Sequence, residues 1–215
     1  MKIKLNLDIF LFLILFFITN QIEIYTLVMT FTLIHELAHL ISGVLLGFEV
    51  DTFRIMPLGF SIEFKTNIAD YNNKIIHSNI LAVKKIIIAS AGPLFNLFVV
   101  IFGIIFNINV NIIYANLLLL LFNLLPIYPL DGGRILNEIL KIYFGNRRAY
   151  KYTNIIINVL AIVLTIIASI TIMIINNVAI LLITCVIWII VIQENKKYST
   201  YNKIYKTIDK DCNYL

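Results

Sequence analysis

The segment TLIHELAHLISG, residues 32–43, contains two histidines and a glutamate at a spacing that suits metal chemistry. His35 and His39 are four residues apart, so on a helix both imidazoles project from one face and can bind the same zinc ion. Glu36 follows His35 directly, which makes it a poor third ligand but a good general base. The pattern H-E-x-x-H therefore predicts zinc-assisted hydrolysis.

The residues that flank this segment are apolar, which argues against an ordinary solvent-exposed helix. An ionisable residue at bilayer depth costs on the order of 3 kcal/mol, so the three polar side chains need a role that offsets this cost. One alternative is structural, with the histidines and the glutamate forming hydrogen bonds between membrane helices. We favour a metal site because the zinc spacing would otherwise be accidental.

A hydrolytic zinc site needs a third protein ligand beside two histidines. Asp131 in FNLLPIYPLDGGR is the best donor, because it is a carboxylate next to an interrupted apolar segment, and the two glycines after it allow close backbone packing. Taken alone, Asp131 would be interpreted as a helix cap or turn residue. Its interpretation as a metal ligand depends on the histidines of residues 32–43. His77 lies in the polar stretch NNKIIHSN and is predicted to be an ordinary exposed histidine.

The composition is that of a membrane protein: 60% of the 215 residues are hydrophobic and 13% are charged, whereas soluble domains carry roughly 25% charged residues. We therefore predict an all-α polytopic membrane protein with about six transmembrane helices and a small membrane-associated β-hairpin or loop between the second and third. The six candidate spans are Leu7–Thr19, Ile24–Gly47, Ile86–Asn107, Ile112–Leu125, Ile155–Ile175 and Val178–Ile192. The basic, apolar N-terminus resembles a signal peptide, but no small-residue cleavage site follows it, so we expect it to remain as the first span.

The distribution of lysine and arginine predicts the topology. Six spans with the N-terminus inside place all 17 basic residues on the cytoplasmic side. The opposite loops, near Asn20, Asn109 and Asn177, contain none. We expect a multi-pass protein with both termini in the cytoplasm.

Residues 48–85 form the longest segment between predicted spans. SIEFK within it alternates as a strand does, which favours a hairpin or edge strand, with an irregular amphipathic loop as the open alternative. We expect residues 1–195 to form one domain and residues 196–215 to form a short basic cytoplasmic tail. Cys185 and Cys212 lie in different kinds of segment and predict neither a disulfide framework nor a zinc–thiolate site.

Three motifs in order, HELAH, SAGPLFN and FNLLPIYPLDGGR, resemble the site-2 protease family of intramembrane zinc metalloproteases. The resemblance extends over roughly residues 30–135. It implies the zinc ligands His35, His39 and Asp131, the catalytic base Glu36, and the residues Asn123 and Pro129 that help to position the substrate. Asn96 also occupies a family motif position, without an assigned role. Many members have a Gly-Gly pair where this chain has PLGF, so the conformation of that segment does not follow from the resemblance.

Within the family, a six-span layout with the zinc helix second is similar to the stage IV sporulation protein FB branch. Those proteases release a mother-cell sigma factor from its membrane-held pro-form. The resemblance implies a bacterial cell-membrane protease that cleaves a membrane-embedded or membrane-tethered protein substrate, and sporulation is the finer expectation. Inhibitory membrane partner proteins are a further expectation, and no nucleic-acid partner is expected.

Two rival functions use the same residues. A metal-binding membrane transporter or sensor could employ the His and Asp ligands, but it needs no general base such as Glu36. A transport path also usually needs polar residues on the far side, where the loops contain little but asparagine. A catalytically idle membrane scaffold would need neither the ligands nor the base.

Overall fold

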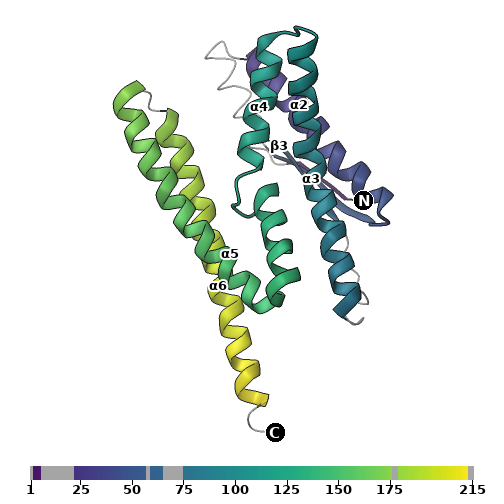
Figure 1. Ribbon diagram of the computed structural model, residues 1–215, viewed down its shortest axis with the longest axis vertical. Helices are drawn as coiled ribbons and strands as arrows, with labels where there is room; N and C mark the ends of the chain where they lie inside the picture. Colours follow the sequence, from purple (N-terminus) through teal and green to yellow (C-terminus); the bar gives the residue numbers. More distant parts are fainter. Residues whose placement is uncertain (1, 6–21, 57–58, 65–74, 176–178, 213–215) are drawn as a thin grey trace. The chain divides into compact units, whose positions relative to one another are not determined.

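The computed structural model describes residues 2–5, 22–56, 59–64, 75–175 and 179–212 (Figure 1). The chain divides into two compact units, Met1–Leu125 and Pro126–Leu215. The first predicted span, residues 7–19, lies outside the described residues.

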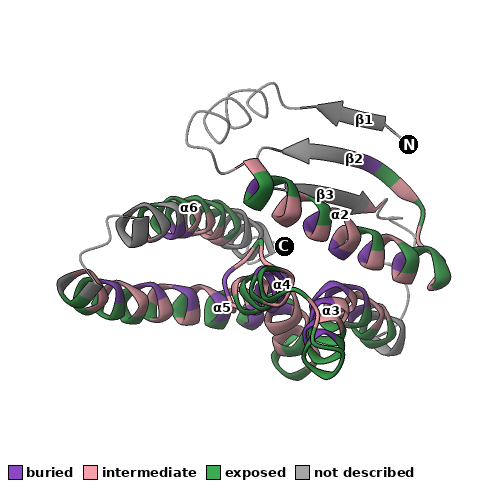
Figure 2. Ribbon diagram, turned by 90° about the horizontal axis from the view of Figure 1, so that it is seen from above, coloured by how far each residue is buried: buried purple, intermediate pink, exposed green. Residues whose placement is uncertain are grey.

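The first unit combines three helices with a small sheet. Its elements are β1 (Lys2–Leu5), α2 (Ile22–Leu45), β2 (Val50–Met56), β3 (Gly59–Phe64), α3 (Ile75–Ile105) and α4 (Val110–Asn123). Helix α2 packs against α3, α4 and β3, and in Figure 2 it lies between the sheet and α3. The second and third predicted spans therefore correspond to neighbouring helices, α2 and α3.

The sheet has the strand order β1-β2-β3. Strands β2 and β3 are antiparallel, with Phe53 opposite Ile62, and β1 joins β2 in parallel, with Ile3 opposite Phe53. Part of the 48–85 segment thus consists of paired strands, whereas its association with a membrane stays a prediction. Strand β1 was not expected, although KIKL alternates charged and apolar residues with the period of a strand.

The buried residues of α2 form one stripe, because they recur at intervals of three, four and seven residues. They are Tyr25, Thr32, His35, His39 and Gly43. Where the stripe ends, Gly43 holds α2 close to β3: a Cβ on this glycine would lie 2.3 Å from the ring of Phe64.

The described part of the first unit buries some polar side chains and exposes large apolar ones. Asn96 and Asn116 are fully buried, whereas the rings of Phe98 and Phe102 are exposed and stack on each other on α3. Phe106, directly after the helix, extends this exposed row with its ring tilted against Phe102. Figure 2 shows the corresponding exposed side of α3. Water would penalise such a surface and lipid would not, so this arrangement favours a membrane setting.

Within the described ranges, three helical segments are long and apolar enough to cross a membrane: Ile22–Leu45, Asn79–Ile105 and Asp131–Ile172. Helix α4 is apolar but shorter, with 14 residues. The mostly helical character of the predicted fold is confirmed, and the count of six spans stays a prediction.

The second unit contains α5 (Asp131–Ile175) and α6 (Ala179–Cys212), which pack along each other (Figure 1). Helix α5 consists of two helices joined at Gly145, whose φ of 75° lies in the left-handed region that glycine adopts at low cost. Between the second of these helices and α6, Asn158 and Asn195 exchange two amide hydrogen bonds of 2.9 and 3.0 Å. Helix α6 continues through most of the expected tail, and the domain boundary at residue 195 stays a prediction.

Candidate metal centre

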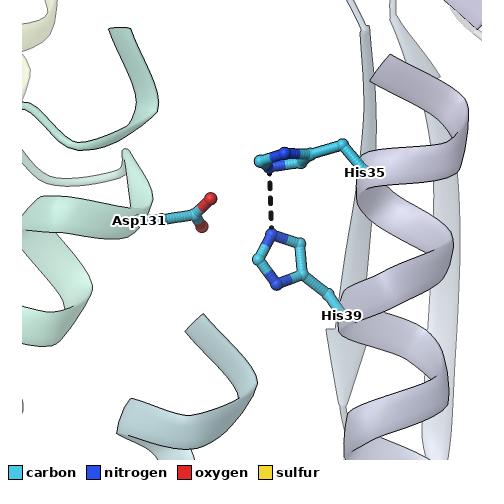
Figure 3. Close-up of side chains that lie close together, drawn as sticks. All are labelled: His35, His39 and Asp131. Atoms are coloured by element: carbon cyan, nitrogen blue, oxygen red, sulfur yellow. Dashed lines mark hydrogen bonds between the residues drawn. The ribbon is translucent and has the colours of Figure 1, made fainter. Parts of the chain in front are cut away.

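His35 and His39 are buried side by side on α2 (Figure 3). Their side chains come from successive turns, their Nε2 atoms are 3.1 Å apart, and their rings meet edge to face at 85°. Two nitrogens bound to one zinc ion at tetrahedral angles lie about 3.3 Å apart. The separation and the donor chemistry of the two imidazoles therefore fit a shared zinc ion.

Helix α3 supplies the wall behind the two imidazoles. The Ile88 carbonyl oxygen lies 2.7 Å from His39 Nδ1, and Asn96 Nδ2 lies 3.0 Å from His35 Nδ1. Between them, a Cβ on Gly92 would lie 2.5 Å from His39 Nε2 and 2.6 Å from His35 Nε2. Position 92 therefore needs glycine, because a larger residue would occupy the space beside both candidate ligand atoms.

Glu36 follows His35 on α2 and is half-buried rather than enclosed. A carboxylate in this setting keeps access to water and to an incoming peptide, as a general base requires. Its assignment as the catalytic base stays a prediction.

Asp131 opens α5 in the second unit and is buried (labelled in Figure 3). A carboxylate in the first turn of a helix is favoured by the helix dipole, and Arg134 Nη1 lies 3.8 Å from Asp131 Oδ1. Asp131 and the two histidines each offer a ligand atom of a kind that zinc prefers. The coordination of one ion by all three residues stays a prediction.

The segment before Asp131 is a tight turn that interrupts the apolar stretch, as the sequence predicts: α4 ends at Asn123 and α5 begins eight residues later. The Leu130 amide donates to the Ile127 carbonyl over 2.9 Å. A Cβ on Gly133 would lie 2.3 Å from the backbone nitrogen of Tyr128, so the second glycine of LDGG allows the turn to lie directly on the first turn of α5.

The other candidate residues are less enclosed. Asn123 is the last residue of α4 and is half-buried, and Pro129 is exposed in the turn after a cis peptide bond. Their roles in substrate positioning stay predictions. His77 lies in the first turn of α3, and its side chain is outside the described part of the chain.

Sequence reasoning did not identify the contributions of Ile88 and Gly92. The signal for Gly92 was present in SAGPLFN, which points to close helix packing but not to the partner of the glycine. The Ile88 contribution is a main-chain carbonyl, and no side-chain pattern predicts it.

Comparison with known proteins shows which proteins this chain is similar to. Residues 103–167 match the sequence profile of peptidase family M50. A zinc metalloprotease of Methanocaldococcus jannaschii is 28% identical over 167 residues, 69% of this chain and 45% of the relative. Stage IV sporulation protein FB of Bacillus subtilis is 27% identical over 145 residues, 62% of this chain and 46% of the relative. The chain thus spans about half the length of these curated relatives.

Among solved structures, a site-2 protease from Methanocaldococcus jannaschii superposes with a TM-score of 0.62 at 23% identity, covering 89% of both chains. This likeness concerns the fold. The chain therefore has the fold of a site-2 protease, and its residues 103–167 match peptidase family M50.

Proposed function

We propose that the protein is a zinc metalloendopeptidase that cleaves a membrane-associated protein within or near the bilayer. The observation that carries this proposal is the pair of buried imidazoles on an apolar helix, with Nε2 atoms 3.1 Å apart and a glutamate next to the first of them. The family match and the named relatives point to the same chemistry.

In this proposal His35, His39 and Asp131 hold the zinc ion, and an open position remains for the reaction. Bound there, zinc supplies Lewis-acid chemistry, activating water and polarising the scissile carbonyl. Glu36 takes the proton from the attacking water and delivers it to the nitrogen of the leaving amine as the carbon–nitrogen bond breaks.

A helical substrate has to unwind before cleavage, because the hydrogen bonds of a helix shield its amides. We propose that the unwound segment pairs with β3, which lies at the edge of the sheet among the described strands. Phe64 on β3 contacts Gly43, one turn beyond His39, so such pairing would bring a peptide to the helix that carries the histidines. Asn123 and Pro129 are proposed to position the peptide near the metal.

The finer assignments are also proposals. We place the protein in a bacterial cell membrane as a multi-pass protein with both termini in the cytoplasm, in accord with the segregation of its basic residues. The similarity to stage IV sporulation protein FB supports activation of a membrane-held pro-sigma factor as the cellular role. Inhibitory membrane partners would belong to the same setting.

A metal transporter is the weaker candidate. Transport would require no glutamate next to the first ligand, whereas hydrolysis requires a base at that place.

Co-expression with candidate single-span membrane proteins tests the proposal. Glu36→Gln keeps the size of the side chain but cannot accept the proton, so we expect cleavage to fall by at least about a hundredfold while zinc content is unchanged. Immunoblotting of the substrate and elemental analysis of the purified protein measure the two quantities. Near-wild-type cleavage by Glu36→Gln would remove Glu36 as the base, and zinc transport with no cleavage of any substrate would favour the transporter.

A further inference from the structure

Helix α3 contacts the two candidate zinc-binding histidines through three positions spaced four residues apart. Ile88 contributes its carbonyl, Gly92 leaves room for the rings, and Asn96 contributes its amide. All three lie on one face of the helix. Asn96 is fully buried and, among the described residues, its Oδ1 has no hydrogen-bond partner. An unpaired buried amide oxygen is costly, so it calls for an explanation.

The hydrogen bond to Ile88 defines the tautomer of His39. A carbonyl oxygen can only accept, so His39 Nδ1 carries the proton and donates over 2.7 Å. The Nε2 atom of a neutral His39 then carries a lone pair and no proton, which is the form that binds a metal.

The tautomer of His35 follows from the proposed metal site. Zinc coordination through Nε2 leaves the proton of the neutral ring on Nδ1, which then has to donate a hydrogen bond. The Asn96 side-chain amide reaches this atom, with its nitrogen 3.0 Å from His35 Nδ1. Turning an amide by about 180° exchanges its nitrogen and its oxygen, so the Asn96 oxygen can take this place as the acceptor.

We propose that Asn96 is a positioning residue that fixes the tautomer and orientation of His35, with its amide oxygen accepting from His35 Nδ1 in the zinc site. His39 needs no such partner, because a backbone carbonyl already fixes its tautomer. This inference rests on the proposed role of His35 as a zinc ligand. It assigns to Asn96 the second hydrogen bond that metal-binding histidines usually make.

Zinc affinity tests this assignment without reference to cleavage. Asn96→Leu removes the acceptor, and we expect zinc binding to weaken about 10- to 100-fold. Asn96→Asp keeps an acceptor, and we expect it to retain affinity within about threefold of wild type or to bind more tightly. Asn116→Leu is the matched control: Asn116 is equally buried, but its amide nitrogen bonds the Ile112 carbonyl instead of a histidine. Affinities come from chelator competition with the full chain in detergent.

If Asn96→Asp does not fold, a spectroscopic measurement on the wild-type protein still tests the inference. The chain has three histidines, so ¹⁵N-histidine spectra can be assigned with a His77→Gln variant. We expect both ligand histidines to carry their proton on Nδ1 when zinc is bound, and Asn96→Leu to alter the signals of His35 but not those of His39. Unchanged zinc affinity in Asn96→Leu, equal weakening in well-folded Asn96→Leu and Asn96→Asp, or a His35 proton on Nε2 with zinc bound would each overturn the inference. A wild-type protein that binds no zinc would instead contradict the metal centre itself.

Discussion

The carboxylate of Asp131 decides whether the proposed zinc site has two protein ligands or three. We expect about one zinc ion per purified wild-type chain, nearly complete loss in the double variant His35→Ala/His39→Ala, and clear weakening in Asp131→Ala. Elemental analysis after dialysis against a weak chelator measures this. Glu138→Ala is the control, because Glu138 is a carboxylate on the same helix that pairs with Lys141 over 2.6 Å. Equal zinc retention in Asp131→Ala and Glu138→Ala would exclude Asp131 as a ligand.

Gly92 makes a second residue-scale prediction. The added methyl group of Gly92→Ala would lie within 2.6 Å of both histidine rings, so either the rings or α3 must move. We expect a loss of zinc affinity of about tenfold or more, as for other changes beside metal ligands. Gly103→Ala on the same helix is the control, since, of the residues that the structure describes, its methyl group meets only the side chain of Ile113. Similar zinc affinity for Gly92→Ala and wild type would show that the rings have room to spare.

Much of the histidine site could be predicted from the sequence, because its chemistry resides in side chains at fixed spacing. His35 and His39 share a buried face of a helix as their four-residue spacing requires. The contributions of α3 could not be predicted, since they consist of a main-chain oxygen at Ile88 and a missing Cβ at Gly92. Such contacts depend on how two helices pack, which one sequence does not reveal.

Among the helices and strands, the clearest prediction concerns Gly145 in α5. This residue joins two helices with φ 75° and ψ 164°. Among the described residues, nothing lies within 4 Å of a Cβ placed there, so a substitution is penalised by backbone conformation and not by crowding. We expect Gly145→Ala and Gly145→Asn each to lower stability by about 1–3 kcal/mol, because this backbone conformation is essentially restricted to glycine. Thermal unfolding in detergent measures both variants.

Asn146→Ala provides the comparison for Gly145, because residue 146 is exposed and begins the helix after the joint. It should unfold at close to the wild-type temperature. A Gly145→Ala protein as stable as Asn146→Ala would mean that the joint straightens into one continuous helix at no cost.

The apolar segments predicted α2 and α4 within two residues at each end, because hydrophobic length marks a membrane helix directly. The predicted boundaries are wrong where a helix continues beyond its apolar stretch. Helix α3 begins at Ile75, eleven residues before the predicted span, and α6 runs on to Cys212 through a polar sequence. The helix over 131–144 was also not predicted, since hydropathy does not detect polar helices.

At the scale of the whole molecule, the arrangement of polar and apolar surface follows from composition. A chain with 13% charged residues cannot cover itself with polar groups, so large apolar side chains are exposed along α3, α4 and α5. Fully buried asparagines in the first unit complete the inverted pattern. Composition thus predicts the surroundings of the protein, whereas the number of spans depends on where each helix begins and ends.

The side of the membrane to which each loop belongs is the last prediction. The turn between α3 and α4 contains no lysine or arginine, whereas the joint at Gly145 is followed by Arg147, Arg148 and Lys151. We therefore expect the first segment outside the cell and the second inside. In a chain with Cys185 and Cys212 replaced by serine, Asn111→Cys should react with a membrane-impermeant maleimide in intact cells, and Arg148→Cys only after permeabilisation. Both positions are exposed, so a failure to react reports the membrane barrier and not burial in the fold. Labelling of Arg148→Cys in intact cells, with Asn111→Cys protected, would invert the proposed topology and place the zinc chemistry at the opposite face.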